Sequence, residues 1–411
     1  MISRRRLLAS SAALALGAWG VRAYAGGGFQ AAEARLRHFV DSGALPFASL
    51  RVASRGRVLL EAHVSGIERI GPDSVYRIYS MTKPVVAAGI VLLVEDGRLA
   101  LADPVAKYVP EFAGMTVLAG SLDKREAARP MTVGHLLTHS CGLANSWGDG
   151  QVAPLYRQAG LIASAWMFDP RIGGLEGFAR RLAALPLEFQ PGSNWIYGYG
   201  LDIAGLVVER VSDRRLGDFL QERIFGPLGM ASTGFCVAEG QSERLAGLYS
   251  PRDGAPVPVA DGSERNPLRR PFADSGSAGL VSTLDDYGRF ADMLANLGRA
   301  GKRRVMSEAS AKRMMTPYGP QAPLAAALER FGGYAPGSVG QALGGIVRLD
   351  DRGGPGSTGE YAWGGAAGTG FWATPGSGLS VTLMTQLLPA TGVPVREVLR
   401  PLIYGAPADA G

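Results

Sequence analysis

The sequence predicts an α+β fold in which both ends of the chain build one antiparallel sheet. A strand-turn-strand pattern lies near each terminus, and such patterns indicate strands that pair with each other. Between them, helical apolar spacing predicts an inserted helix-rich region that flanks the sheet. The predicted division is residues 1–25 as an export signal, 26–83 and 275–411 as the sheet region, and 84–274 as the mainly helical insertion with long loops.

The first 25 residues predict an export signal rather than part of the fold. A basic start is followed by the uncharged apolar stretch 7–21 and by Ala-Tyr-Ala at 23–25, a small-x-small cleavage site. The stretch has 15 residues, fewer than the roughly 18 of a spanning helix, so we expect a cleaved signal and not a permanent anchor. We expect no membrane span after the signal is removed. Paired arginines precede the apolar stretch, as in twin-arginine signals, so we expect export, to the periplasm.

Composition indicates a globular chain, since 46% of the residues are hydrophobic. The net charge of +6 falls to about +2 when the four arginines of the signal are removed, which is too little to indicate nucleic-acid binding. The two cysteines, Cys141 and Cys236, exclude a disulfide-built scaffold and a four-thiolate metal site. We expect both to be buried small residues, and the sequence leaves open whether they pair.

The elements near the termini follow from periodicity and turn residues. Four short apolar runs predict strands: 50–54, 58–64, 370–373 and 379–386. The turn residues Arg55-Gly56-Arg57 and 374–378 separate the members of each pair, so each pair is predicted to form a hairpin. Helical apolar spacing over 29–42 and 395–404 predicts one helix outside each hairpin.

The middle of the sequence is predicted to be rich in helices. Helical spacing is clearest over 133–138, 175–185 and 202–211. Residues 240–274 are rich in Pro, Gly, Asp and Arg, which predicts a long irregular excursion. Loops of that length usually shape a binding site or are disordered.

A Ser-x-x-Lys pattern occurs twice, and its context separates the two copies. The copy at Ser121 lies in a charged segment, where its lysine would be hydrated. Ser80 follows the extended-type run 75–79 and precedes 84–94, which is apolar on nearly every face. We therefore predict that Ser80 begins a buried helix and that Lys83 lies one turn later on the same face.

That placement would give the serine what acyl transfer needs. A helix N-terminus offers N–H groups and a favourable dipole to an oxyanion. A lysine in apolar surroundings loses its proton more readily than in water, and a neutral amine beside a hydroxyl can accept its proton. The alternative is that Ser80 merely caps the helix while Lys83 extends its amine to the surface.

Other hydrolytic and nucleotide-binding patterns are absent from the sequence. It contains no Gly-x-Ser-x-Gly elbow and no phosphate-binding Gly-x-x-x-x-Gly-Lys-Ser/Thr run. His135 and His139 have the spacing of a zinc-binding pair, but no glutamate lies between them. We expect an ordinary helical histidine pair with satisfied hydrogen bonds and no metal site.

Six segments together resemble the serine beta-lactamase and penicillin-binding-protein-like superfamily, especially its class C-like branch and the family VIII carboxylesterases. In chain order they are Tyr-Ser-Met-Thr-Lys-Pro at 79–84, then 135–143, 191–197, 226–230, 279–287 and 363–369. The resemblance spans nearly the whole chain after the signal, and it implies a beta-lactamase/transpeptidase-like fold. It also implies that Ser80 is the nucleophile, Lys83 its activator and Tyr197 the phenol that relays protons to the leaving group.

Two departures from the class C pattern favour an ester substrate. Tyr199 stands where that pattern has an asparagine, whose amide ordinarily hydrogen-bonds the acyl amide of the substrate. Trp363-Gly364-Gly365 replaces Lys-Thr-Gly, which removes a cationic partner for a substrate carboxylate. Family VIII carboxylesterases carry a Trp-Gly-Gly of this kind. The resemblance thus implies these substrate-binding residues: Tyr199, Trp363, Gly364 and Gly365.

We therefore expect a serine hydrolase that forms an acyl-enzyme, in the first place a carboxylesterase for small esters. The Ser80 and Ala366 N–H groups would hold the oxyanion while Tyr197 protonates the leaving alkoxide. A beta-lactamase or D-amino-acid peptidase, an acyltransferase, and a non-catalytic binding protein for cell-wall fragments stay open. No metal or organic cofactor is implied, the expected partner is a small ester or amide substrate, and the oligomeric state is open.

Overall fold

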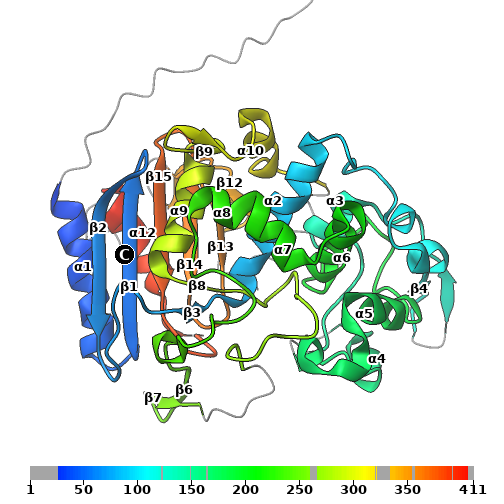
Figure 1. Cartoon of the computed structure of the whole chain (residues 1–411), viewed down its shortest axis with the longest axis horizontal. Coiled ribbons are helices and arrows are strands. Elements are labelled where there is room, and N and C mark those ends of the chain that lie inside the picture. Colours follow the sequence, from blue (N-terminus) through cyan, green and yellow to red (C-terminus); the bar gives the residue numbers. More distant parts are fainter. Residues whose placement is uncertain are drawn as a thin grey trace, which may run out of the picture.

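The computed structural model describes residues 26–121, 124–148, 150–162, 165–259, 266–319, 321, 334–353, 357–390 and 392–405. The predicted export signal lies outside these residues. Figure 1 shows the sheet on one side of the molecule and a helical region on the other, with α2 (Thr82–Glu95) between them. No helix among the described residues is both long and apolar enough to cross a membrane.

A seven-stranded antiparallel sheet is built from both ends of the chain, in the order β11-β12-β13-β14-β15-β1-β2. Its strands are β1 (Phe47–Ser54), β2 (Arg57–Ser65), β11 (Val339–Ala342), β12 (Gly345–Arg348), β13 (Tyr361–Gly364), β14 (Gly370–Thr374) and β15 (Leu379–Met384). The N-terminal and C-terminal parts meet where β1 pairs with β15, with Ser49 opposite Met384. The predicted fold class is thereby confirmed, whereas the division at residues 83 and 275 stays a prediction.

Both predicted hairpins are present. In the first, Arg55 and Gly56 have φ of 51° and 78°, so the two turn residues are left-handed, as the tight turns that match strand twist require. In the second, β14 pairs with β15 across the glycine-containing turn. Strands β11 and β12 escaped prediction because four-residue strands containing glycine are too short to show a period of two.

Helices cover both faces of the sheet. Helices α1 (Gly26–Asp41) and α12 (Val395–Tyr404) contact each other, and α1 also contacts β1 and β2. Helix α9 (Leu284–Ala295) packs on β1, β14 and β15. Because both faces are covered, β1 is buried along nearly its whole length instead of alternating between buried and exposed residues.

The helical region surrounds α2, which is buried on every face from Thr82 to Leu93. It contacts α6 (Gly200–Ser212), α7 (Leu216–Leu220) and α10 (Glu308–Met314). A helix that is hydrophobic on every face is buried in a core. This explains why α2 lies between the sheet and the helical region. The other α-helices among the described residues are α3 (Val133–Leu137), α4 (Ala153–Gln158), α5 (Gly174–Ala183) and α8 (Gly226–Leu228).

The part of the chain that the structure describes also holds four two-stranded pairs: β3 (Tyr76–Arg77) with β8 (Val281–Ser282), β4 (Thr116–Leu118) with β5 (Arg125–Ala127), β6 (Tyr249–Arg252) with β7 (Ala255–Pro258), and β9 (Arg299–Ala300) with β10 (Arg303–Arg304). The β6–β7 hairpin lies inside 240–274, so that segment is less irregular than predicted. Residues 260–265 lie outside the described part of the chain.

Neither cysteine takes part in a disulfide. Cys141 is buried, and this burial raises the pKa of its thiol to about 12. Cys236 is only half-buried, so the expectation of burial is right for one cysteine and wrong for the other.

Candidate active site

The chain turns sharply at the predicted nucleophile. The extended run predicted over 75–79 is reduced to the two residues of β3, and a 3-10 turn over Tyr79–Met81 follows. Helix α2 begins only at Thr82, so Ser80 precedes the helix instead of starting it. The backbone leaves the extended conformation at Ile78, with φ of −92° and ψ of −5°, and Tyr79 follows with a left-handed φ of 44°. Such a conformation in a residue with a side chain is strained, and strain of this kind gathers at functional sites.

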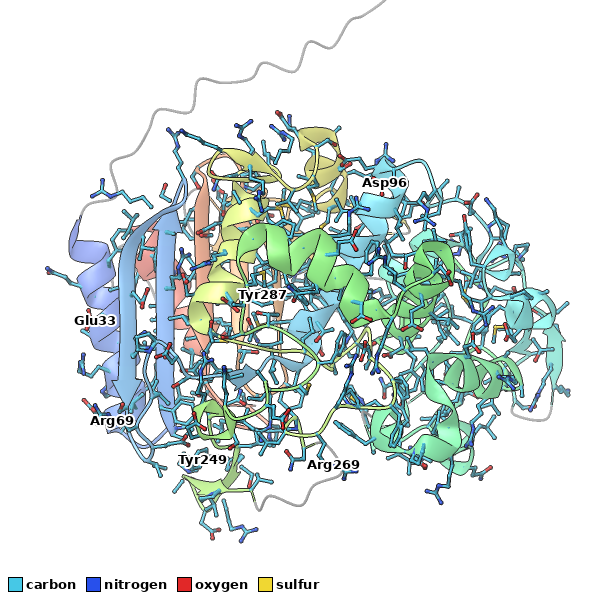
Figure 2. All side chains as sticks on the ribbon, viewed as in Figure 1. Glu33, Arg69, Asp96, Tyr249, Arg269 and Tyr287 are labelled. Carbon is cyan, nitrogen blue, oxygen red and sulfur yellow. The ribbon has the colours of Figure 1, made fainter. Side chains whose placement is uncertain are left out.

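Two remote segments hold this turn in place. The Tyr287 hydroxyl, from α9 and near the centre of Figure 2, donates a hydrogen bond to the Met81 carbonyl at 2.8 Å. The Leu280 N–H donates to Thr82 Oγ1 at 3.1 Å. These contacts fix the backbone on the helix side of Ser80, whose own side chain stays partly accessible.

The three predicted catalytic side chains meet at the N-terminal end of α2. Ser80 Oγ lies 2.5 Å from the Tyr197 hydroxyl, and Lys83 Nζ donates to Ser80 Oγ at 3.2 Å. The Lys83 Nζ also lies 4.5 Å from the centre of the Tyr197 ring. Lys83 is 1% exposed, so its amine does not reach the surface, and the alternative of a mere helix cap is wrong.

Aromatic rings surround the Tyr197 ring. The ring centre of His139 lies 4.7 Å away, that of Trp147 6.0 Å away, and that of Trp363 6.2 Å away in a stacked arrangement. Trp195 adds a fourth ring at 6.5 Å. This packing orients the phenol toward Ser80 and places Trp363, one of the predicted substrate-binding residues, beside it.

His139 contradicts the expectation of a satisfied helical pair. It lies after the end of α3 with a left-handed φ of 54°, and it is almost completely buried. Neither of its ring nitrogens has a hydrogen-bond partner among the described residues. Burial, and then the nearby charge of Lys83, lower the pKa of His139 well below 6.5. The ring therefore stays neutral and serves as an uncharged wall behind the phenol.

A loop over residues 145–148 supports Tyr197 from another side. The Asn145 amide donates to the Tyr197 carbonyl at 2.7 Å, and its Oδ1 accepts the N–H groups of Trp147 and Gly148. All of these contacts are internal to the protein. Asn145 therefore ties the loop to the Tyr197 backbone.

The structure does not bring Tyr199 to Ser80. Its side chain is buried, and its hydroxyl donates a hydrogen bond to the Leu161 carbonyl at 2.8 Å and accepts one from Ser146 Oγ at 2.9 Å. Tyr199 thus supports the loop over 145–148 from behind. Direct substrate contact by its side chain stays a prediction without geometric support.

The end of β13 lies beside the nucleophile turn. A Cβ at Gly365 would approach the Ile78 carbonyl to 2.4 Å, so only glycine permits this close contact two residues before Ser80. Ala366 follows in an exposed turn. A Cβ at Gly364 would meet the Arg396 guanidinium, which fills that space from α12. Strand alternation puts Gly364 on the face opposite Trp363.

Ser277 was missed by the sequence analysis. Its carbonyl accepts a hydrogen bond from Lys83 Nζ at 2.8 Å, which gives the amine a second fixed partner. Every residue has a backbone carbonyl, so the sequence cannot show which carbonyl binds the lysine. The only indication near Ser277 was the neighbouring segment 279–287, which resembles the family.

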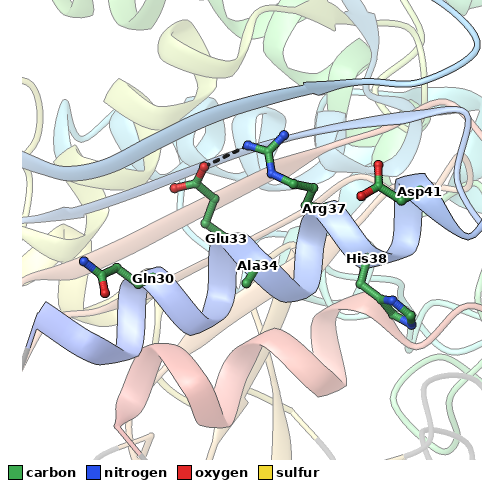
Figure 3. Close-up of a pocket in the computed structure, with 6 residues that line it drawn as sticks. All are labelled: Gln30, Glu33, Ala34, Arg37, His38 and Asp41. Carbon is green, nitrogen blue, oxygen red and sulfur yellow. Dashed lines mark hydrogen bonds and ion pairs between the residues drawn. The ribbon is translucent and has the colours of Figure 1, made fainter.

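The described residues contain no group of three or more His, Cys, Asp or Glu side chains that could hold a metal ion. A hollow of about 340 Å³ lies on the outer face of α1, far from Ser80 in sequence, and Figure 3 shows its Glu33–Arg37 ion pair. It holds exposed charges of a helix face and no nucleophile with a base.

Comparisons with known proteins identify the family of the chain. The chain matches the family described as Beta-lactamase over residues 32–401. It is 33% identical to a lovastatin esterase of Penicillium rubens, over 71% of this chain and 74% of that protein. It is 32% identical to the esterase EstB of Burkholderia gladioli, over 81% of this chain and 82% of that protein.

Among solved structures, EstCE1, a hydrolase with promiscuous acyltransferase activity, superposes with a TM-score of 0.77 at 24% identity. The superposition covers 92% of this chain and 98% of EstCE1, and it shows the same fold. The family match covers the strands from both ends of the chain and includes Ser80, Lys83 and Tyr197. The chain therefore belongs to the beta-lactamase family.

Proposed function

We propose that this protein is a serine carboxylic ester hydrolase that acts through an acyl-enzyme on Ser80. The observation that carries the proposal is the contact of Ser80 Oγ with both the Tyr197 hydroxyl and the Lys83 amine, at 2.5 and 3.2 Å. Nucleophile and base within hydrogen-bond reach, with the base oriented by a third group, is the arrangement that nucleophilic catalysis requires. The named relatives that cover most of the chain include two esterases.

The reaction would proceed in two steps. Ser80 Oγ bonds to the ester carbonyl carbon while its proton passes to the Tyr197–Lys83 pair, and the pair returns that proton to the leaving alkoxide as the C–O bond breaks. Water then attacks the acyl-enzyme, gives a proton to the pair, and releases the acid as Oγ recovers a proton. The N–H groups of Ser80 and Ala366 are proposed to stabilise the oxyanion in both steps.

The surroundings of the site favour an ester over a beta-lactam or a peptide. The tyrosine that replaces the class C asparagine has its hydroxyl bonded inside the protein. The position of the class C lysine is held by Trp363, an uncharged ring. Neither an acyl amide nor a substrate carboxylate would find its usual partner, whereas a simple ester requires neither.

Parallel rates test this proposal. We expect the enzyme to hydrolyse nitrophenyl esters of short acids at least a hundredfold faster than it opens a chromogenic cephalosporin, measured as kcat/KM. A fluorophosphonate should label Ser80, as located by mass spectrometry, and the Ser80→Ala variant should neither label nor turn over. A folded protein that does not label at Ser80 would instead support a non-catalytic binding protein.

We further propose that the protein acts outside the cytoplasm, exported by residues 1–25 with their paired arginines. Fusing these residues to a reporter that is active only after export in the folded state tests the proposal. Replacement of Arg4, Arg5 and Arg6 by lysine should retain the reporter in the cytoplasm. Unchanged export would contradict a twin-arginine route.

A further inference from the structure

A buried carboxylate lies behind the catalytic lysine. Asp202, in the first turn of α6, is 0% exposed. Its Oδ1 accepts hydrogen bonds from Ser275 Oγ at 2.5 Å and from the Ser277 N–H at 3.2 Å. The Ser277 N–H is shared with Ser275 Oγ, also at 3.2 Å. The Oδ1 atom of Asp202 therefore binds both serines of the turn over residues 275–277.

The turn is also pressed against the helix that carries Asp202. A Cβ at Gly276 would lie 2.0 Å from the Leu201 carbonyl, so the residue between the two serines must be glycine. The turn and the start of α6 thus form one unit, held by steric contact and by the carboxylate.

This unit ends on the catalytic amine. The Ser277 carbonyl accepts a hydrogen bond from Lys83 Nζ at 2.8 Å, and the amine in turn donates to Ser80 Oγ at 3.2 Å. A lysine side chain is a flexible four-carbon stem, so its terminal nitrogen is positioned only by what it binds. Two fixed acceptors on opposite segments determine where that nitrogen lies.

The carboxylate is costly at this place. Burial raises the pKa of the Asp202 carboxyl, and the hydrogen bonds from Ser275 and Ser277 and the charge of Lys83 oppose that rise. Its Oδ2 has no hydrogen-bond partner among the described residues. A buried polar atom left without a partner costs free energy, and such atoms call for a reason beyond packing.

We propose that Asp202 is a positioning residue of the catalytic site: it fixes the turn over 275–277, and the Ser277 carbonyl of that turn holds Lys83 Nζ against Ser80 Oγ. The proposal rests on the hydrolase function proposed above. Asp202 touches neither the nucleophile nor the substrate side of the site in the described contacts. Its effect on catalysis therefore passes through the lysine.

Three variants separate the links of this chain. Asp202→Ala removes the acceptor, Asp202→Asn keeps a carbonyl oxygen at Oδ1, and Ser275→Ala removes one link but leaves the carboxylate. Asp286→Asn is the matched control, because Asp286 is also a buried carboxylate with a raised pKa but binds Ser232 and Thr233 instead.

For a short nitrophenyl ester, we expect Asp202→Ala to lower kcat about 100-fold with KM within about threefold, since misplacing a reacting group by 1 Å can cost this much. Ser275→Ala should lower kcat about tenfold, and Asp202→Asn should recover most of the loss of Asp202→Ala. The acid limb of the pH profile of kcat/KM should move in Asp202→Ala and Ser275→Ala and stay in place in Asp286→Asn.

Turnover and labelling of the wild-type protein at Ser80 test the proposed hydrolase function by themselves. Failure of the positioning role can therefore be distinguished from failure of that function. If wild type labels and a folded Asp202→Ala labels as fast with the same pH profile, the positioning role is overturned. It is equally overturned if Asp202→Asn is as slow as Asp202→Ala, because charge and not hydrogen bonding would then matter. If Asp202→Ala does not fold, Ser275→Ala decides by the same criteria.

Discussion

The Tyr197 hydroxyl is the group through which every proton of the proposed reaction passes. Replacing it by phenylalanine keeps the ring and its contacts with His139 and Trp363 but removes the oxygen that lies 2.5 Å from Ser80 Oγ. We expect Tyr197→Phe to lower kcat by about 10²- to 10⁴-fold, the usual contribution of general acid–base catalysis, with little change in KM. Steady-state rates on a nitrophenyl ester measure this, and a loss below tenfold would assign proton transfer to Lys83 alone.

His139 should make the fold sensitive to acid. In the folded protein burial, and then the charge of Lys83, lower the pKa of His139 well below 6.5, whereas an unfolded histidine has a pKa near 6.5. Below pH 6.5 this histidine binds a proton in the unfolded chain but not in the folded chain. The contribution of neutral His139 to the free energy of unfolding is therefore present at neutral pH and is lost as the pH falls. The loss approaches about 1.4 kcal/mol per pH unit.

Denaturant unfolding of wild type and His139→Phe at pH 7 and at pH 5 measures this effect. The groups that face the ring, Lys83 and Tyr197, are present in both proteins, so the difference in slope isolates His139. Equal pH dependence of the free energy of unfolding in the two proteins would contradict the assignment.

At this scale the sequence revealed the reactive residues but not what surrounds them. Ser80 and Lys83 were recognisable because a lysine in an apolar run is conspicuous and the two are one turn apart. The left-handed Tyr79, the buried His139 and the Ser277 carbonyl were not, because each is set by backbone contacts with segments far away in sequence. Residue type carries little information about such contacts.

The loop over residues 145–148 is the element that presents a large apolar side chain beside the phenol. Trp147 is 61% exposed although its neighbours Asn145 and Ser146 are buried and hydrogen-bonded. Arg157 also donates to the Ser146 carbonyl at 2.6 Å. The loop is therefore held firmly while its indole faces solvent, which suits contact with a substrate ring.

We expect Trp147→Ala to raise KM for esters with an aromatic alcohol by about two- to tenfold, since an aromatic contact contributes about 0.5–1.5 kcal/mol. KM for an ethyl ester should change little. Ile67→Ala is the control, because Ile67 is a similarly exposed apolar residue, at 56%, in the segment that follows β2. Equal changes for both esters would exclude contact between Trp147 and the alcohol part.

Elements with local signals were predicted well. The two hairpins and the helix over 395–404 follow from turn residues and apolar spacing within a few residues. The loop over 145–148 was not predicted, because its anchors, the Tyr197 carbonyl and the Tyr199 hydroxyl, lie about 50 residues later in the chain.

For the molecule as a whole, a buried ion cluster ties α12 to the sheet. Glu360 is fully buried and accepts hydrogen bonds from Arg348, Arg400 and the Tyr404 hydroxyl, at 3.3, 3.1 and 2.7 Å. We expect Glu360→Gln to lower the free energy of unfolding by about 3–5 kcal/mol, because it leaves two buried cations without their counter-charge. Denaturant titration measures the loss.

The same change at Glu33, whose ion pair with Arg37 is exposed, should cost less than about 1 kcal/mol. In both variants kcat of the folded enzyme should stay near wild type, since neither residue contacts Ser80, Lys83 or Tyr197. A large fall in kcat for Glu360→Gln, at a temperature where the protein is folded, would show that the cluster also supports the active site.

The strand order has a consequence for biosynthesis. Ser49 pairs with Met384, so the first strand made by the ribosome can pair at once with β2 but gains its second neighbour, β15, only when almost the last codons have been translated. At roughly 5–20 residues per second, this apolar strand waits about 20–70 s for β15. During that time it must be shielded by chaperones or by its own hairpin, and a nascent chain cut short before β15 would leave it as an open edge for aggregation.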